Sequence, residues 1–350
     1  MPHLLDLSAE GLKAWLKQRG HSAFRGAQIW RWLFANRATD FAEMSDLPRN
    51  LREELPTEWN IWTSQIVAHQ ESSDGTEKLL LQLADGGKIE CVLLRDGDRR
   101  SICISTQVGC AMGCVFCASG LDGVDRNLST GEILEQMLRL QRLLPAEERL
   151  SHIVVMGMGE PLMNLEHLLP ALEIANSDDG LGISHRRITI STVGLPKQLD
   201  QLTEQHSKYH LAVSLHASND ELRTKIVPIN KSVGLAEVLA AADRYFAASG
   251  RQLTFEYVLL ADLNDRPEQA QELVDILQGR TALLNVIPYN PVAGLPYRTP
   301  SPSAVHRFRE VLLEGGVNVK FRQRKGVDIN AACGQLRRNQ PGQLVQIAPP

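Results

Sequence analysis

The chain has 350 residues and a net charge of −4 at pH 7, with apolar and charged fractions that are ordinary for a globular protein. This overall charge does not by itself indicate a nucleic-acid partner. No apolar run approaches the roughly 20 residues that a membrane-spanning helix needs, and the amino terminus lacks the regions of a signal peptide. We therefore expect a cytoplasmic protein with reduced cysteines and no membrane partner, and a monomer by default.

The first 95 residues change from a helical to a strand pattern. Apolar residues such as Ile29 and Leu33 recur at helical spacing, which predicts a small helical accessory domain over residues 1–62. Residues 63–95 contain short apolar runs separated by turn residues. That pattern predicts an antiparallel β-ribbon extension.

Strand and helix patterns alternate over residues 96–330. The predicted strands are 101–105, 152–156, 187–191, 210–215, 253–259 and 284–288, with helices at 130–143, 166–176, 196–205, 234–249 and 267–278. A further helix at 302–314 and a strand at 317–323 follow. This order is typical of an α/β fold with a parallel sheet and crossover helices. Six such units suit a partial TIM-like barrel, (β/α)6, and are too few for a closed eightfold one.

Three cysteines lie in one loop after the first barrel strand, at Cys110, Cys114 and Cys117. Their C-x3-C-x2-C spacing can hold three irons of a 4Fe-4S cluster and leave the fourth iron open, whereas an electron-transfer cluster normally has four thiolates. The spacing, with Phe116 before the last cysteine, is typical of radical S-adenosylmethionine (SAM) enzymes. The alternative is a zinc site on Cys114 and Cys117, which would need a second ligand pair that the sequence does not show at matching spacing.

Polar or glycine-rich residues follow the ends of several predicted strands. Because the carboxyl ends of parallel strands meet at one mouth, we expect these positions to converge on a single pocket beside the cysteine loop. They are Gly157–Glu160, Ser191–Thr192, Ser214–His216 and Tyr289–Asn290. Each position alone is also consistent with an ordinary turn or a structural side chain.

The segment from Arg298 to Arg338 is basic, with nine lysines and arginines against three acidic residues. Within an otherwise acidic chain this is a candidate phosphate-binding surface, and Arg322, Arg324 and Lys325 are its central cluster. A solvated basic surface explains the charge equally well.

The ordered motifs resemble those of the RlmN/Cfr family of radical SAM adenine methyltransferases that act on ribosomal and transfer RNA. The matching segments run from Phe24–Trp30 through Ser72–Thr76 and Gln107–Cys110 to Asp328–Leu336, and therefore cover almost the whole chain. The sequence Glu160-Pro161-Leu162 has the RlmN form, so the resemblance favours methylation at C2 of adenine over Cfr-like methylation at C8.

The resemblance implies a reaction that uses two SAM molecules for each methyl transferred. Cys333, in a C-terminal loop over residues 331–350, would take a methyl group as a thiolate and form an S-methylcysteine intermediate. A 5′-deoxyadenosyl radical, made from a second SAM on the open iron, would activate that methyl group for addition to the adenine. Glu90 would be the proton acceptor, and Cys103 would pair with Cys333 in a disulfide as the adduct is released. From the strand pattern alone, Glu90 would instead be an outward-facing residue and Cys103 a small buried one.

The resemblance also implies the SAM-binding residues and the partners. Glu160 would receive the SAM ammonium, and side chains at the other strand ends would bind its ribose or carboxylate. The implied set is Gly159, Glu160, Ser191, Ser214, Leu215, His216 and Asn290. The substrates would be 23S ribosomal RNA and transfer RNA, and the electron donor a flavodoxin-type protein. The alternative from another class is a zinc-stabilised RNA-binding protein without catalytic activity, in which Cys333 has no role.

Overall fold

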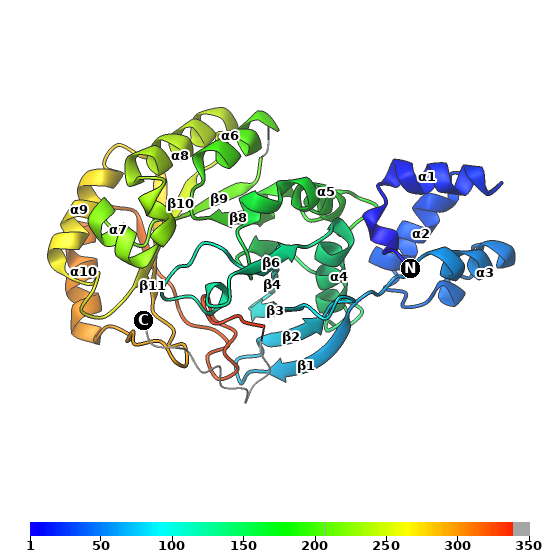
Figure 1. The fold of residues 1–350 in the computed structure, drawn as a ribbon, viewed down its shortest axis with the longest axis horizontal. Helices are drawn as coiled ribbons and strands as arrows, with labels where there is room; N and C mark the ends of the chain where they lie inside the picture. The colour runs from blue at the N-terminus through cyan, green and yellow to red at the C-terminus, as the bar shows by residue number, and fades with distance from the viewer. Residues whose placement is uncertain (207, 339–350) are drawn as a thin grey trace.

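Three helices fold the first 62 residues around an apolar cluster: α1 (Ala9–Gln18), α2 (Arg25–Phe34) and α3 (Arg49–Glu58). The structure is a computed structural model, and it describes residues 1–206 and 208–338. Each helix has one apolar face, and the side chains of Leu16, Ile29 and Leu51 are fully buried between them. These helices lie at one end of the molecule, beyond α4 (Thr130–Gln141) (Figure 1).

A ten-stranded sheet forms the rest of the scaffold, in the order β1-β2-β3-β4-β7-β8-β9-β10-β11-β12. Strands β1 to β4 pair antiparallel, and β4 and β7 to β12 pair parallel. The predicted ribbon is therefore present, and it continues the barrel sheet edge to edge. The strands are β1 (Gln65–Glu71), β2 (Glu77–Gln82), β3 (Lys88–Asp96), β4 (Arg99–Cys103), β7 (His152–Val155), β8 (Ile188–Thr192), β9 (His210–Ser214), β10 (Leu253–Leu259), β11 (Ala282–Pro288) and β12 (Val319–Phe321).

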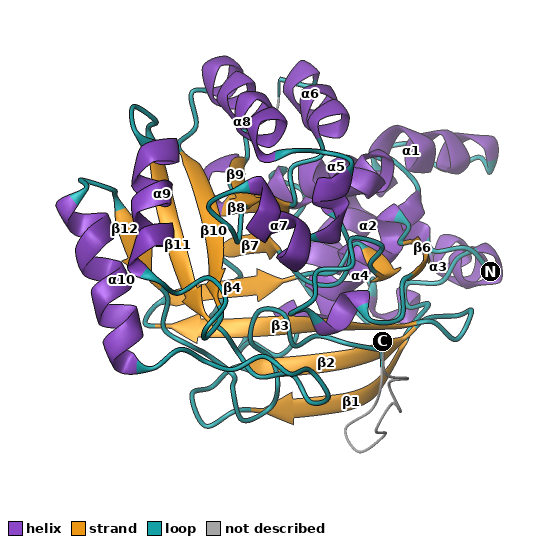
Figure 2. Cartoon of the chain, turned by 60° about the vertical axis from the view of Figure 1, so that its left-hand side comes forward, coloured by secondary structure: helices purple, strands orange, loops and turns teal. Residues whose placement is uncertain are grey.

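Crossover helices cover the outer face of the parallel strands, as Figure 2 shows. Besides α4 they are α5 (Leu165–Asn176), α6 (Pro196–Glu204), α8 (Leu235–Ser249), α9 (Pro267–Leu277) and α10 (Pro302–Glu314), whereas α7 (Asp220–Ile226) lies at the carboxyl ends of the strands. The partial (β/α)6 barrel predicted from the alternating pattern is confirmed. Within residues 1–206 and 208–338, no helix combines the length and apolar character needed to cross a membrane.

Two elements beside the cysteine loop were not predicted. One is the small hairpin of β5 (Gln107–Gly109) and β6 (Val124–Asn127), whose strands are too short to show an alternating pattern. The other is α7, a two-turn helix that Asn219 begins by accepting the N–H of Leu222 at 2.9 Å. Residues 339–350, within the predicted C-terminal loop 331–350, lie outside the described residues.

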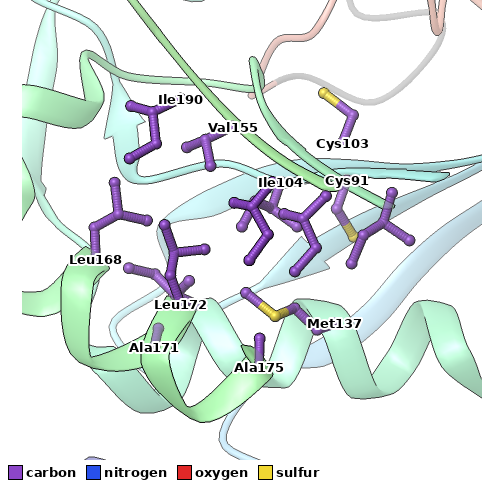
Figure 3. Close-up of a cluster of buried hydrophobic side chains, with 14 of the residues drawn as sticks. Cys91, Cys103, Ile104, Met137, Val155, Leu168, Ala171, Leu172, Ala175 and Ile190 are labelled. Carbon is purple, nitrogen blue, oxygen red and sulfur yellow. The ribbon is translucent and has the colours of Figure 1, made fainter. Parts of the chain in front are cut away.

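Two cysteines on neighbouring strands lie on opposite faces of the sheet. Cys91 is fully buried among core side chains such as Met137 and Leu172 (Figure 3). Cys103 on the neighbouring strand pairs with Val92, so its side chain lies on the opposite face from Cys91 and points toward the C-terminal segment. Strand alternation therefore places one cysteine in the core and the other at the inner face of the barrel.

A buried carboxylate joins the N-terminal helices to the barrel. Glu135 on α4 is 1% exposed and accepts hydrogen bonds from the Ser64 hydroxyl at 2.6 Å and the Thr63 N–H at 2.9 Å. His3 Nε2 lies 3.1 Å from Glu135 and Arg139 Nη2 lies 2.8 Å from it. Burial opposes its ionisation, yet these partners outweigh burial and hold the pKa of Glu135 well below its usual range.

We predict that Glu135→Gln lowers the free energy of unfolding by about 3 kcal/mol, because it removes the anion from a buried charged cluster. Since the folded-state pKa is depressed, the carboxylate stabilises the wild type above the unfolded pKa of about 4.3, and this contribution is lost as the pH falls below that value. Urea unfolding between pH 7 and pH 3 measures both effects.

The matched control is Glu147→Gln, which makes the same change at an exposed residue just after α4. It should change the unfolding free energy by less than about 0.5 kcal/mol. Equal destabilisation by the two variants would contradict the role of Glu135.

Candidate active site

The three loop cysteines lie at the carboxyl end of the barrel strands, between β5 and β6. The loop is held by hydrogen bonds from the Cys110 N–H to the Gly123 carbonyl at 2.8 Å and from the Val115 N–H to the Ile226 carbonyl at 3.1 Å. Burial raises the pKa of Cys114 well above its usual value, and the neighbouring Cys117 and Cys110 raise it further. Ligation to iron would favour the thiolates, because metal binding and thiol deprotonation are coupled.

The geometry of these cysteines argues against the zinc alternative. A zinc ion needs its sulfur and nitrogen ligands within about 2.3 Å of one point. Among the residues that the structure describes, no group of three histidine, cysteine or acidic side chains could hold a single metal ion in this way. A 4Fe-4S cluster bonds each cysteine to a different iron, so it does not require the thiols to meet at one point.

Gly159 brings the chain close to the β5–β6 hairpin just before Glu160. Gly159 has φ 104°, and a Cβ there would lie 2.7 Å from the Gln107 side chain, so only glycine fits. Glu160 is 2% exposed and accepts the N–H groups of Leu162 at 3.1 Å and Val193 at 3.0 Å. Burial raises the pKa of Glu160, and the Thr192 hydroxyl and these N–H donors oppose the rise. The donors fix the carboxylate, and its two oxygens can still accept from a cationic ligand.

Arg223 on α7 organises the next strand ends. Its guanidinium donates to the carbonyls of Val193 at 2.6 Å, Ser214 at 3.1 Å and Leu215 at 3.2 Å, and the side chain is fully buried. These contacts hold the half-buried Ser214 and the buried Leu215 at the mouth, beside the half-buried Ser191 at the end of β8. The sequence pattern did not indicate Arg223, since a basic residue on a short helix is usually exposed.

His216 is held in one tautomer. It has φ 58°, its Nδ1 accepts the Val258 N–H at 3.1 Å, and its ring packs edge-on to Phe116 with centroids 4.8 Å apart. Burial lowers the pKa of His216 to about 3, and the charge of Arg223 adds to this effect. The imidazole is therefore neutral near pH 7 and carries its proton on Nε2.

Asn290 has an unsatisfied buried oxygen at the mouth. Its Nδ2 donates to the Cys333 carbonyl at 3.2 Å, while its Oδ1 is buried without a hydrogen-bond partner among the described residues. A buried acceptor left open is costly unless a ligand donates to it. A ribose hydroxyl or an ammonium group has the required donor, so this site fits SAM.

Cys333 and Cys103 line the same cavity of about 710 Å³ on the inner face of the barrel, together with Asn290, Arg322 and Glu256. Burial, and after it the nearby Cys333, raises the pKa of Cys103 to about 12, while Arg322 opposes this. All six cysteines are free, so the pairing of Cys103 with Cys333 is not present in this structure. The cavity has the size of a small-molecule or nucleoside pocket.

Glu90 does not face solvent, as its strand pattern suggested. It is 3% exposed, and its carboxylate lies 2.8 Å from Lys78 Nζ and accepts the Arg337 N–H at 2.7 Å. Burial raises the pKa of Glu90, and Lys78 opposes the rise. The face of β3 that carries Glu90 also carries Val92, the register partner of Cys103.

The three predicted phosphate ligands lie in different settings. Arg322 lines the cavity, where the nearby Cys333, followed by Glu256, raises its pKa and burial opposes the rise. Lys325 donates to the Arg95 carbonyl at 2.8 Å and lies 3.1 Å from Asp96, and Arg324 is exposed. All three residues nevertheless line the same cavity, so the structure brings them together there.

A polar pair inside the cavity was not predicted from the sequence. Asn285 on β11 donates to Glu256 on β10 at 2.7 Å, and burial raises the pKa of Glu256 to about 7 although Arg322 opposes the rise. The available signal was a carboxylate inside the otherwise apolar run Leu253–Leu259, because such a residue must face a polar site.

The loop that carries Cys333, residues 326–338, is fastened to the cysteine loop. The Ala118 N–H donates to the Gly334 carbonyl at 2.8 Å, and the Ser119 hydroxyl donates to the Leu336 carbonyl at 2.7 Å. Arg338 donates to the Val108 carbonyl at 3.0 Å and pairs with Asp125 at 2.6 Å. These contacts place Cys333 at the mouth, between the cysteine loop and the cavity. We call residues 326–338 the Cys333 loop.

Comparison with known proteins agrees with this arrangement. The profile of the ribosomal RNA large subunit methyltransferase N-terminal domain matches residues 2–61, and that of the radical SAM superfamily matches residues 104–274. A probable dual-specificity RNA methyltransferase RlmN of Rhodopirellula baltica is 66% identical over 96% of this chain and 91% of the relative. One from Geobacillus kaustophilus is 44% identical over 96% and 93%.

A solved structure shows the same fold. The crystal structure of a radical SAM methyltransferase from Sphaerobacter thermophilus superposes with a TM-score of 0.94 and 40% identity, over 97% of this chain and all of that one. The radical SAM match spans Cys110, Cys114 and Cys117 and implies a 4Fe-4S cluster and SAM. This chain belongs to the RlmN family of dual-specificity RNA methyltransferases, within the radical SAM superfamily.

Proposed function

We propose that this protein methylates C2 of an adenine in 23S ribosomal RNA and of an adenine in transfer RNA, by way of a methyl group carried on Cys333. The observation that carries the proposal is the convergence of Cys333 and Cys103 on one cavity. Family membership and the large-subunit RNA methyltransferase domain over residues 2–61 support RNA as the substrate.

The cofactor sites follow from the residues at the mouth. Cys110, Cys114 and Cys117 would hold the cluster, and the open Oδ1 of Asn290 and the carboxylate of Glu160 would bind polar groups of SAM. When bound, cluster and SAM supply the one-electron chemistry that an electron-poor adenine carbon requires. The remaining SAM residues of the proposal, Gly159, Ser191, Ser214, Leu215 and His216, lie around the same mouth.

The two cysteines of the cavity have complementary roles. The Cys333 thiolate would take the methyl group of SAM by displacement, with S-adenosylhomocysteine as the leaving group and Arg322 as a nearby cation. After the carbon has bonded to adenine, the Cys103 thiol would give up its proton as its sulfur attacks the Cys333 sulfur. This forms the S–S bond and breaks the S–C bond. The electron pair of that bond stays on carbon, which takes up a proton to become the new methyl group.

Glu90 is the proposed acceptor of the adenine ring proton. Its burial raises its proton affinity, which suits a general base that works near neutral pH. It lies under the Cys333 loop, where it accepts the Arg337 N–H. We place the incoming adenine between this loop and the cavity, flipped out of its stack.

The proposal also covers the RNA contacts, the cellular compartment and the electron donor. The N-terminal helices and the exposed Arg324 would contact phosphates of the RNA. We expect a cytoplasmic protein, because the cysteines are free thiols and a cluster with an open iron is labile. We also expect a monomer that receives electrons from a flavodoxin-type protein. The RlmN form of Glu160-Pro161-Leu162 supports C2 over C8.

The direct test is to reconstitute the protein anaerobically with iron and sulfide and to supply SAM, a reductant and unmodified 23S RNA. Mass spectrometry of the digested nucleosides should show 2-methyladenosine. The Cys114→Ala variant should lose bound iron and the product together, because one cluster ligand is missing. A product of 8-methyladenosine would replace the C2 assignment, and product from an iron-free Cys114→Ala protein would refute the cluster.

We predict that Cys103→Ala stops the reaction after the RNA has bonded to Cys333. Without the second thiol, nothing attacks the Cys333 sulfur, so a protein–RNA adduct should accumulate on denaturing gels while 2-methyladenosine falls at least about 100-fold. Cys333→Ala should give neither adduct nor product.

The matched control is Cys91→Ala, the same substitution on the neighbouring strand but on the core face. It should cost about 1 kcal/mol of stability or somewhat more and leave product formation unchanged. Free product release by Cys103→Ala would refute its role.

A further inference from the structure

A buried ion pair on the strand ribbon contacts the Cys333 loop, in addition to the hydrogen bonds of Asp328 and Gly326 with the turn between β1 and β2. Lys78 on β2 lies 2.8 Å from Glu90 on β3, and its Nζ also donates to the Asn330 carbonyl at 3.1 Å. The other carboxylate oxygen of Glu90 accepts the Arg337 N–H at 2.7 Å. Asn330 and Arg337 stand on either side of Cys333 in the sequence. The pair therefore holds the loop at both flanks of the methyl carrier.

The register of the ribbon makes this arrangement possible. Lys78 pairs with Val92 and Leu80 with Glu90, so Lys78 and Glu90 are diagonal neighbours on one face of the antiparallel pair. Diagonal neighbours lie within reach of long side chains. Lys78 is 5% exposed and Glu90 is 3% exposed. Because water cannot replace either partner at this depth, each side chain must contact the other.

A buried lysine and glutamate are a costly way to join two strands. Replacing such a pair with apolar side chains is often neutral or stabilising, so structural stability alone gives no reason for it. Arg337 also favours the ionised form of Glu90 through its charge, but its effect on the pKa of Glu90 is smaller than that of Lys78. The Arg337 N–H contributes a second donor, and Cys91 faces the opposite side of β3. Lys78 is the side-chain cation that contacts the carboxylate.

We propose that Lys78 is the positioning residue for proton transfer to Glu90: it keeps this carboxylate ionised and turned toward the Cys333 loop. The proposal rests on the proposed function and extends it to a residue that touches neither substrate nor cofactor. In an apolar site without Lys78, burial would favour the protonated form of Glu90, which cannot accept a proton.

The same contacts link proton uptake by Glu90 to the docking of the loop at Arg337. When Glu90 takes the ring proton, the carboxylate loses its charge, and its attraction to Lys78 and to the Arg337 N–H weakens. The contacts of Gly334, Leu336 and Arg338 do not involve Glu90 and are unchanged by this step.

The test compares the full-length, reconstituted Lys78→Gln, Lys78→Arg and Lys88→Met proteins with the wild type. In Lys78→Gln the new side chain can still donate to the Asn330 carbonyl but carries no charge, whereas Lys78→Arg keeps the positive charge. Lys88, on β3, is the matched control for loss of a lysine from the same ribbon. Each protein receives RNA whose target adenine carries hydrogen or deuterium at C2, and formation of 2-methyladenosine is timed.

Lys78→Gln should form product at least about tenfold more slowly, which is part of the 100-fold or more that a positioned general base contributes. Its deuterium isotope effect should exceed that of the wild type, since proton transfer becomes slower than the other steps. Lys78→Arg should restore most of the rate, and Lys88→Met should match the wild type in both measurements.

Methylation of Cys333 by SAM without RNA, read by mass spectrometry, separates this proposal from the proposed function. It should be unchanged in Lys78→Gln. A wild-type rate in Lys78→Gln, or a slow rate without a larger isotope effect, would overturn the role of Lys78. Absence of Cys333 methylation and product in the wild type would instead overturn the proposed function.

Discussion

Docking of the Cys333 loop across the mouth of the barrel is the constraint on which the site depends. The loop reaches the cysteine loop through Gly334, β3 through Arg337 and the small hairpin through Arg338. A loop without regular structure must find partners for its backbone groups elsewhere. Here those partners belong to the elements that carry the three loop cysteines and Glu90. Packing of the loop therefore places Cys333 beside these residues.

Buried charges gather at this mouth, and each is compensated by fixed groups. Arg223 donates to carbonyls at strand ends, Glu160 accepts backbone N–H groups, and Glu90 pairs with Lys78. Such groups would be costly in an ordinary core. Arg223 and Glu160 are retained where the parallel strands end, because backbone groups there are not used by the sheet and can act as partners. Glu90 and Lys78 lie instead within the antiparallel strands β3 and β2 and compensate each other. The electrostatic character of the site thus follows from the barrel architecture.

Much of the fold could be predicted from the sequence, because the strands of a parallel sheet are continuous apolar runs and the helices between them have one apolar face. The two elements that were not predicted, α7 and the β5–β6 hairpin, were missed for local reasons. Helix α7 is only seven residues long and begins at a polar cap, and the β5–β6 hairpin is too short for a period. Both elements support the cysteine loop, so the sequence pattern was weakest next to the site, where local structure serves function.

The sequence by itself determined the chemistry that the chain can carry, because cysteine spacing and ordered motifs are properties of the chain alone. It could not determine which way a strand residue faces, because a shift of one residue reverses every side chain. Only the tertiary structure placed Cys103 at the cavity and Cys91 in the core, buried Glu90 against Lys78, and turned Arg322 inward. These differences arise from strand register and from the docked Cys333 loop, which bring together residues that are distant in the sequence.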